Sequence, residues 1–174
     1  TYAGGVCYYN KTGKKFRFYN PSNPQSITGI VGPVIEVNDK LFIATEGAGL
    51  LEMNKQTETF LYHKIVDDIS GSYEKNIIKS LCRDGERILC GTNLGTIYSF
   101  DLLTKKFTLV YRMPSEHSIY YLGKTQNGDL IIGGVIDNGL TIISKKDGSR
   151  INTFPVRGKP DITFPDVRCV YETE

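Results

Sequence analysis

One pattern recurs along this chain at steps of 44, 47 and 44 residues. In each copy a glycine opens a short apolar strand, a polar turn follows, and the copy closes on a large apolar residue. The closing residues are Phe16, Phe60, Phe107 and Ile151. A period of about 40 to 50 residues is typical of a propeller blade, in which four short strands form one sheet. The repeat therefore restricts the chain to an array of small β units.

Two further strands precede the glycine of each complete copy, and a tight turn joins them. In one copy the turn is Asp84-Gly85 and the strand after it is the apolar run 88–92; in the next, Asn127-Gly128 leads to 130–134. Asp-Gly and Asn-Gly favour two-residue hairpins, because both central positions take positive φ. Each unit thus reads as four antiparallel strands, which we call A, B, C and D in chain order.

The B strands are apolar on both faces of the pleat, as in residues 88–90 and 130–132. A strand in a sheet with one wet face should alternate between apolar and polar residues, so both faces of these sheets should be covered. The D strand does alternate, with Phe107, Leu109 and Tyr111, as expected of an outermost strand. Small pairs such as Gly91-Thr92 end the B strands and predict a close approach between neighbouring blades.

These patterns predict an all-β fold, a β-propeller fragment of four-stranded antiparallel blades that forms a single domain over 1–174. Its parts would be a partial blade with strands C and D over 1–32, complete blades over 33–75, 76–117 and 118–165, and the first strand of a further blade over 166–174. No stretch keeps a helical apolar spacing for three turns, so almost no helix is expected. The incomplete ends indicate a piece of a longer ring, because a closed ring removes sheet edges.

Composition excludes several classes of protein. The chain is 40% apolar and 23% charged, which favours a globular fold over disorder. A net charge of +2 with mixed signs predicts no nucleic-acid partner. No apolar run is long enough for a membrane span, and no secretion signal is visible. The cysteines Cys7, Cys82, Cys90 and Cys169 form no C-x-x-C pair, and each is expected to be a buried apolar side chain.

The repeating unit resembles the two-component regulator propeller repeat. The resemblance rests on an Asp/Asn-Gly turn, then L-[FIL]-I-[AG]-T, then G-[LVT]-x-x-[YFM]-[DN], and a closing T-x-x-F. It is closest at 130–134 with Gly139-Leu140, at 91–95 with Asp101, and at 167–174. The family usually has Trp in the middle of strand B, where this chain has Phe, Leu or Ile.

The resemblance implies a setting and a role. Such repeats typically form the extracytoplasmic sensor region of hybrid two-component histidine kinases in polysaccharide-degrading gut bacteria. It thus implies a periplasmic domain of an inner-membrane protein that binds an oligosaccharide or another small molecule and signals across the membrane to regulate transcription. The parent chain would be a homodimeric histidine kinase containing the rest of the propeller. The segment itself is expected to be no enzyme and to need no cofactor or metal.

A ligand is expected on the face where the D–A and B–C loops of a propeller meet. The D–A loops are 20–32, 63–75, 112–118 and 156–166, and the B–C loops are 46–48, 93–94 and 135–138. Sugar recognition uses planar hydrogen-bonding groups and an aromatic face. Candidate ligand-binding residues in these loops are Tyr73, Asn93, Arg112, His117, Asp137 and Arg157.

Two other functions stay open. A propeller glycoside hydrolase or lyase would need two carboxylates about 5 to 9 Å apart in one cleft. A scaffold for protein partners would show a contiguous apolar or single-sign patch on the loop face. No catalytic constellation is visible: His63 and His117 are the only histidines, both are expected to be exposed in loops, and neither has zinc-like spacing to other ligands.

Overall fold

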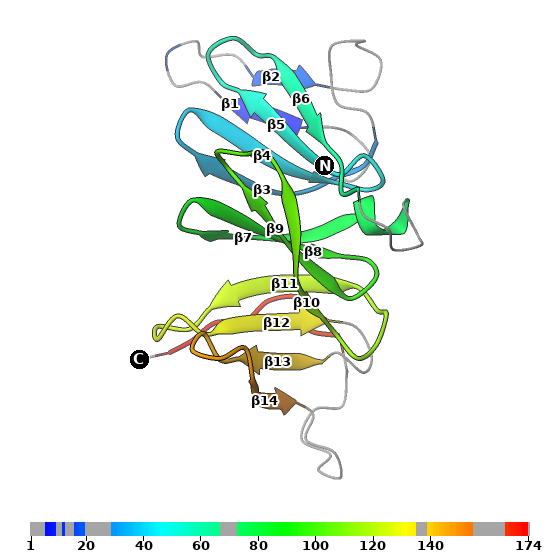
Figure 1. Ribbon diagram of the computed structural model, residues 1–174. Helices are drawn as coiled ribbons and strands as arrows, with labels where there is room; N and C mark the ends of the chain where they lie inside the picture. The colour runs from blue at the N-terminus through cyan, green and yellow to red at the C-terminus, as the bar shows by residue number, and fades with distance from the viewer. Residues whose placement is uncertain are drawn as a thin grey trace. The chain divides into compact units, whose positions relative to one another are not determined.

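The computed structural model describes residues 6–9, 12, 16–19, 29–66, 73–134, 139–154 and 166–173. These residues contain antiparallel strands and one short 3₁₀ helix, η1 (Glu74–Asn76), but no α-helix. The strands form one two-stranded hairpin and three four-stranded sheets, coloured from blue to orange in Figure 1. The predicted all-β fold with four-stranded antiparallel sheets is confirmed. The chain divides into two compact units, 1–78 and 79–174.

The first unit contains a hairpin and one four-stranded sheet. Neighbours in sequence are also neighbours in the sheet, because each turn returns the chain alongside the strand it has just left. Phe42 of the second strand lies opposite Glu52 of the third, and Leu51 lies opposite Tyr62 of the fourth. The strands are β1 (Val6–Tyr9), β2 (Phe16–Tyr19), β3 (Val31–Val37), β4 (Lys40–Thr45), β5 (Leu50–Asn54) and β6 (Phe60–His63).

Strand β4 is buried from Leu41 to its last residue, so both of its faces are covered, as its apolar run predicts. On one face of the sheet, a hydrophobic cluster that includes Tyr19 joins β4 to the hairpin of β1 and β2. The Tyr19 ring meets the ring of Phe60 edge-on, with 5.4 Å between the centroids. The buried members of this cluster are Tyr19, Leu41, Ile43, Leu51 and Met53.

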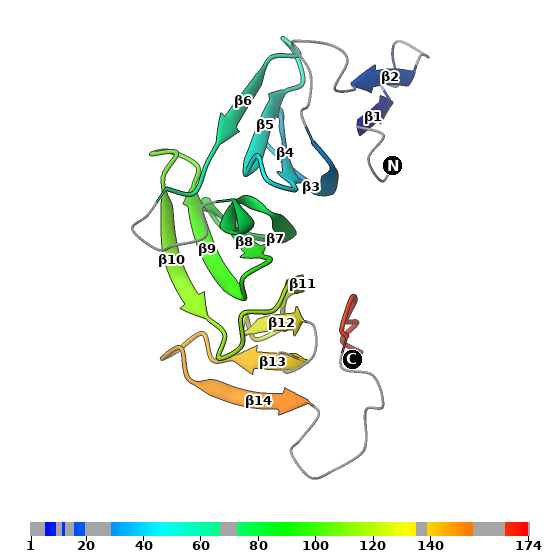
Figure 2. The ribbon, with the colours of Figure 1, turned by 90° about the vertical axis from the view of Figure 1, so that its right-hand side faces the viewer.

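The second unit contains two four-stranded sheets, stacked face to face in Figures 1 and 2. Their strands are β7 (Ile78–Asp84), β8 (Arg87–Thr92), β9 (Thr96–Asp101) and β10 (Phe107–Arg112), then β11 (Ile119–Lys124), β12 (Leu130–Gly134), β13 (Leu140–Ile143) and β14 (Arg150–Phe154). A shared core buries side chains from both sheets, among them Leu89, Ile97, Ile119 and Ile132. This packing covers one face of each of the B strands β8 and β12, through Leu89 and Ile132.

Glycine at the ends of these B strands permits a close approach. A Cβ at Gly91 would lie 2.7 Å from Ile119 Cγ2, and one at Gly133 would lie 2.8 Å from Val167 Cγ1. Neither distance leaves room for a side chain. A hydrogen bond from Ser80 Oγ to the Ile119 carbonyl oxygen, 2.8 Å long, fixes β11 against β7. The close approach predicted from the small residues is thus present at both sites.

In two sheets, the turn between the third and fourth strands is held by hydrogen bonds from backbone N–H groups to the side chain of an Asn or Asp. Asn54 Oδ1 accepts hydrogen bonds from the backbone N–H groups of Gln56 and Thr57, at 2.8 and 3.0 Å. Asp101 Oδ1 accepts one from the backbone N–H of Thr104 at 2.7 Å. Asn and Asp stabilise turns in this way. The recurring Asp or Asn before T-x-x-F is therefore explained by the turn that it closes.

The predicted boundaries of the blades differ in detail from the observed bounds of the strands. β3 begins at Val31, before the predicted blade boundary at 33. Residues 166–173 form no regular strand, although Val167 N donates to the Gly134 carbonyl oxygen at 2.9 Å and Tyr121 Oη donates to the Val170 carbonyl oxygen at 3.2 Å. The blade boundaries, including a further blade that starts in 166–174, remain predictions.

Strand β10 does not alternate as predicted. Its pairing with β9 shifts between Leu109 and Tyr111, which is the mark of a bulge. Leu109 is consequently 40% exposed, whereas Phe107 and Tyr111 stay partly buried. A local register shift of this kind is not visible in the pattern of apolar residues.

The environments of a histidine and a cysteine also differ from the predictions. His63, predicted in an exposed loop, ends β6 and is buried. Among the cysteines, Cys90 is buried as predicted, Cys82 is partly buried and Cys169 is exposed. The burial predicted for Cys169 is wrong, because its segment lacks a covering strand among the described residues. The side chain of Cys7 lies outside the described part of the chain.

Candidate ligand-binding site

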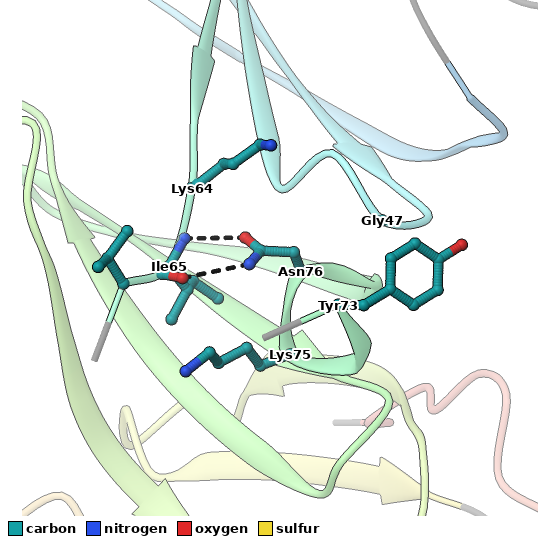
Figure 3. Close-up of a pocket in the computed structure, with 7 residues that line it drawn as sticks. Gly47, Lys64, Ile65, Tyr73, Lys75 and Asn76 are labelled. Atoms are coloured by element: carbon teal, nitrogen blue, oxygen red, sulfur yellow. Dashed lines mark hydrogen bonds between the residues drawn. The ribbon is translucent and has the colours of Figure 1, made fainter. Parts of the chain in front are cut away.

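A pocket of about 290 Å³ opens in the first unit, between the turn after β4 and the loop after β6 (Figure 3). The two segments are the B–C and D–A loops on which the sequence places a ligand. The volume lies near the lower end of the range for small-molecule sites, about 300 to 1,000 Å³. The pocket is lined by Gly47, Lys64, Ile65, Val66, Tyr73, Lys75 and Asn76.

Asn76 holds the two loops together. Its side-chain Oδ1 accepts a hydrogen bond from Ile65 N at 2.8 Å, and its Nδ2 donates to the Ile65 carbonyl oxygen at 3.1 Å (Figure 3). Its backbone carbonyl accepts hydrogen bonds from the N–H groups of Gly47 and Gly49, both at 3.0 Å. Because Asn76 is only 4% exposed, these bonds form away from water and fix the pocket wall.

Tyr73 places an aromatic ring at the mouth of this pocket. A Cβ at Gly47 would lie 2.5 Å from the Tyr73 Cε2 atom, and Gly47 has a φ of +101°. Both the space and the backbone conformation therefore require glycine at this position. The Tyr73 side chain is 61% exposed, so the ring rests against the backbone of Gly47 and still offers surface to a ligand (Figure 3).

Two of the described residues that line the pocket are lysines. Lys75, on η1, is 2% exposed and forms part of the wall, whereas Lys64 is exposed at the rim. Figure 3 shows the two side chains on either side of Ile65. None of the seven lining residues is acidic. A molecule in the pocket would meet ammonium groups, backbone, an amide and an aromatic ring.

The other predicted site residues lie elsewhere or outside the described residues. Asn93 Oδ1 accepts a hydrogen bond from Ser118 Oγ at 2.5 Å, which ties a B–C turn of the second unit to its D–A loop. In the same loop Arg112 Nη1 lies 3.7 Å from Glu116 Oε1, and His117 is partly buried. Asp137 and Arg157 fall outside the described part of the chain.

Among the lining residues that were not candidates from the sequence, three are polar: Lys64, Lys75 and Asn76. All three belong to or adjoin the predicted D–A loop 63–75. The available signal was the large number of residues from His63 to Asn76 whose side chains can donate hydrogen bonds. Which of them face the pocket depends on η1, a single turn of helix that apolar periodicity does not reveal.

A second cavity of about 420 Å³ lies in the second unit, at the A–B and C–D turns. Its lining combines the aliphatic residues Leu89, Val110, Leu130 and Ile143 with charged and polar residues, among them Arg87, Tyr111 and Lys145. The ammonium of Lys124, which also lines it, pairs with Asp84. The cavity lies at the A–B and C–D turns and not at the D–A and B–C loops where the sequence predicts a ligand, so it is a weaker candidate for that ligand.

Within the described ranges, no three His, Cys, Asp or Glu side chains gather as metal ligands would. In the same ranges we find no helix with the length and apolar character needed to cross a bilayer.

Solved structures that resemble the chain include three of note. The extracellular domain of BT3049, designated a hybrid two-component system of B. thetaiotaomicron, is 29% identical, with a TM-score of 0.76 over 97% of this chain and 24% of that one. The corresponding domain of BT4673 from the same organism is 19% identical, with a TM-score of 0.77 over 95% of this chain and 22% of that one. The WD40 β-propeller domain of Doa1 is 19% identical, with a TM-score of 0.60 over 80% of this chain and 47% of that one. No protein-family model and no curated protein matches the chain.

The chain therefore has the β-propeller fold and is an extracytoplasmic segment. The resemblance to the sensor region of hybrid two-component systems, predicted from the sequence, is confirmed by the similarity to BT3049. The other two structures, at lower identity, support the fold. The chain spans about a quarter of the length of the BT3049 and BT4673 domains.

Proposed function

We propose that this chain is part of the ligand-sensing propeller of a hybrid two-component sensor histidine kinase and that it recognises an oligosaccharide outside the inner membrane. The proposal is carried by the resemblance to the extracellular domain of BT3049 over 97% of the chain. The pocket beside Tyr73 supplies a site on the predicted loop face. In this proposal the parent chain is a homodimeric kinase, and the segment binds without catalysing a reaction.

The pocket suits a sugar ring in three respects. The exposed ring of Tyr73 offers a flat apolar face against which the C–H groups of a pyranose can pack. The loops are fixed by Asn76, so little conformational entropy is lost when a ligand binds. The ammonium of Lys64 lies at the rim, where it can donate hydrogen bonds to hydroxyl groups.

Signalling needs a second property. A ligand shifts the balance between two states of a receptor only if it binds one of them more tightly than the other. The described residues that line this pocket come from either end of the β5–β6 hairpin, at 47 before it and at 64–66 and 73–76 after it. In this proposal the ligand binds one geometry of the kinase dimer more tightly than the other and so favours that geometry.

Binding of oligosaccharides to the full-length protein tests this function. Isothermal titration calorimetry with the best binder from a glycan array should show an affinity that Tyr73→Ala reduces about tenfold, the equivalent of ~1.4 kcal/mol. Tyr73→Phe keeps the ring and should retain most of the affinity. Tyr171→Ala removes a tyrosine that is 87% exposed in another segment and should change nothing.

Two results would overturn the proposal. The first is an array on which the folded protein binds no glycan. The second is a bound glycan whose affinity falls equally in Tyr73→Ala and Tyr171→Ala, because the pocket would then have no special part in binding.

A further inference from the structure

We infer that the cavity of about 420 Å³ in the second unit, which we call the turn cavity, binds a small amphipathic carboxylic acid, an aromatic or aliphatic body that carries one carboxylate. The turn cavity shares no lining residue with the pocket beside Tyr73, and the inference does not rest on the proposed function. It follows from a lining in which apolar side chains lie beside cationic ones.

The turn cavity is built by both sheets of the second unit. Its lining residues lie within four stretches, 84–89, 110–111, 124–130 and 143–148, and the structure describes every residue of these stretches. Figure 1 shows the turns between β11 and β12 and between β13 and β14 at the same end of their sheet. The volume lies within the range for small-molecule sites, about 300 to 1,000 Å³.

The innermost part of the lining is apolar. Leu89 and Ile143, exposed by 6% and 5%, belong to the core that the two sheets share, and Leu130 and Tyr111 pack against that core. Val110, on β10, also lines the cavity and is 50% exposed. An apolar ring or chain that covers these side chains takes apolar surface out of water, which favours its binding.

Two cationic side chains of the lining are available to an anion. Arg87 and Lys145 are exposed, and their side chains have no hydrogen bond or ion pair among the residues that the structure describes. The Lys145 side chain lies against Gly128, another lining residue, where a Cβ would be 3.4 Å from Lys145 Nζ. The ammonium group therefore lies at the cavity and not out in the solvent.

The carboxylates around the turn cavity have other partners. Asp84, the acidic residue of the described lining, pairs with Lys124. Asp101 Oδ1 accepts hydrogen bonds within its own turn, and Asp129 Oδ1 accepts one from the backbone N–H of Lys145 at 2.9 Å. The three cations and one carboxylate of the lining leave it with a net positive charge. The acidic residues next to a lining residue in the sequence or the sheet are Glu86, Asp101, Asp129 and Asp147.

The two parts of the lining match the two parts of the proposed ligand. Ammonium and guanidinium groups have donors only, and their hydrogen bonds to a carboxylate are roughly twice as strong as those between neutral groups. A carboxylate bound by Lys145 and Arg87 would leave the body of the acid over the apolar side chains. An amine of the same shape would be repelled by the same two cations.

Matched ligands that differ in charge give the first test, by isothermal titration calorimetry on the full-length protein. One series is indole-3-acetate, indole-3-ethanol and tryptamine, and the other is octanoate, octanol and octylamine. We expect at least one of the two acids to bind, about fivefold more tightly than its alcohol, as exposed ion pairs allow. The amine should bind more weakly than the alcohol, and the two series show whether a ring or a chain is preferred.

Two results of these titrations would overturn the inference. The first is that neither acid binds the folded protein. The second is an alcohol or an amine that binds as tightly as the acid of the same series, because the cations would then have no part in binding. Binding of glycans decides nothing here, since it concerns the pocket beside Tyr73.

Substitutions of exposed residues locate the acid. Lys145→Gln should lower the affinity for the acid about threefold to fivefold and leave that for the alcohol unchanged, whereas Lys146→Gln, at the next residue and outside the lining, should alter neither. Val110→Ser removes apolar surface and should weaken the acid and the alcohol alike, and Leu109→Ser, outside the lining, is its control. An affinity for the acid that is unchanged in both Lys145→Gln and Val110→Ser would overturn the assignment to this cavity.

Discussion

Glu52 and His63 face one another inside the first four-stranded sheet, with 2.9 Å between Glu52 Oε2 and His63 Nε2. The other carboxylate oxygen of Glu52 lies 2.5 Å from Lys40 Nζ. The pairing register of the strands brings Lys40, Glu52 and His63 together. Glu52 lies opposite Phe42 of β4 and opposite Leu61 of β6. Lys40 and His63, each two residues away from these partners, are therefore diagonal neighbours of Glu52 on the same face of the sheet. Glu52 is 5% exposed and thus carries its charge in a largely dry place.

Replacing this carboxylate should cost stability. Glu52→Gln removes the charge that Lys40 and His63 satisfy, and we expect the free energy of unfolding to fall by about 2 kcal/mol. The matched control is Glu36→Gln, because Glu36 also lies 2.5 Å from a lysine, Lys55, but is exposed. An exposed pair contributes less than about 1 kcal/mol. Urea unfolding of both variants measures the difference, and equal losses would show that burial does not matter here.

The sequence could not reveal this trio. The apolar residues Leu51 and Met53 flank Glu52, and this alternation by itself indicates that Glu52 faces water, whereas its side chain is buried. Partners across a sheet, however, depend on register, and the sequence gives register only where turns have fixed lengths. His63 consequently appeared to be a loop residue, although its side chain turns inward at the end of β6.

Asn76 should be as important to the first unit as a core side chain. Asn76→Ala leaves the buried N–H and carbonyl of Ile65 without their partner, which should lower stability by about 1 to 3 kcal/mol. Asn76→Asp keeps the acceptor for Ile65 N and loses the donor to the carbonyl, and it should show a loss of its own. Thermal unfolding compared with Asn127→Ala, at an exposed turn, measures the effect. An Asn76→Ala protein as stable as Asn127→Ala would contradict the role of Asn76 as the link between the loops.

Two glycine substitutions in the second unit separate the effect of close packing at Gly91 from the effect of backbone strain at Gly85. Gly91→Ala would push a methyl group against Ser80 Oγ, which bonds the Ile119 carbonyl oxygen, and against the Ile119 side chain, so we expect a loss of about 1 to 3 kcal/mol from overpacking. Gly85→Ala meets no atom within 4 Å but has a φ of +61°, and it should cost about 1 kcal/mol from strain alone. Urea unfolding ranks the two variants. If Gly85→Ala were the more damaging, the close approach at Gly91 would not be a determinant of stability.

The fold was more predictable than the candidate site for a physical reason. Burial of a strand on both faces needs many apolar residues in a row, so it leaves a strong mark on the sequence, as at 88–92. The pocket depends on a few polar contacts between distant loops, such as those of Asn76 with Ile65 and Gly47, and each contact leaves almost no pattern. Tyr73 is a candidate from the sequence because sugar recognition uses an aromatic face, whereas the burial of Lys75 is set by the fold around it.

The three cysteines whose side chains are described should differ in reactivity. Burial raises the pKa of the Cys90 thiol well above its usual range, and it also raises the pKa of Cys82, on which nearby Lys124 acts in the opposite direction. Because the thiolate is the reactive form, Cys169, which is exposed, should react with a thiol reagent about tenfold faster than Cys82, and Cys90 should react last. Labelling of native protein in a Cys7→Ser background, with the sites read by peptide mass spectrometry, gives the order. Rapid labelling of Cys90 would mean that its strand is not buried.

The Asp101 turn makes a pH-dependent contribution to stability. The backbone N–H and the hydroxyl of Thr104 donate hydrogen bonds to this carboxylate and lower its pKa. In the unfolded chain an aspartate titrates near 3.9, so the unfolded state takes up its proton first as pH falls. The contribution is therefore complete above about pH 5 and disappears as pH falls through the pKa of the folded protein. In the Asp101→Asn variant the side chain at this position is an amide and cannot titrate.

The stability difference between wild type and Asp101→Asn should therefore shrink as pH is lowered from 5 toward about 2, as far as the protein stays folded. Urea midpoints of both proteins across this range measure it, and Glu86→Gln, which changes an exposed carboxylate in the neighbouring turn, is the control. A constant difference at all pH values would mean that Asp101 acts through shape and not through charge. Asn54 forms the equivalent turn in the first unit with an uncharged side chain, so that turn should hold at every pH in the same range.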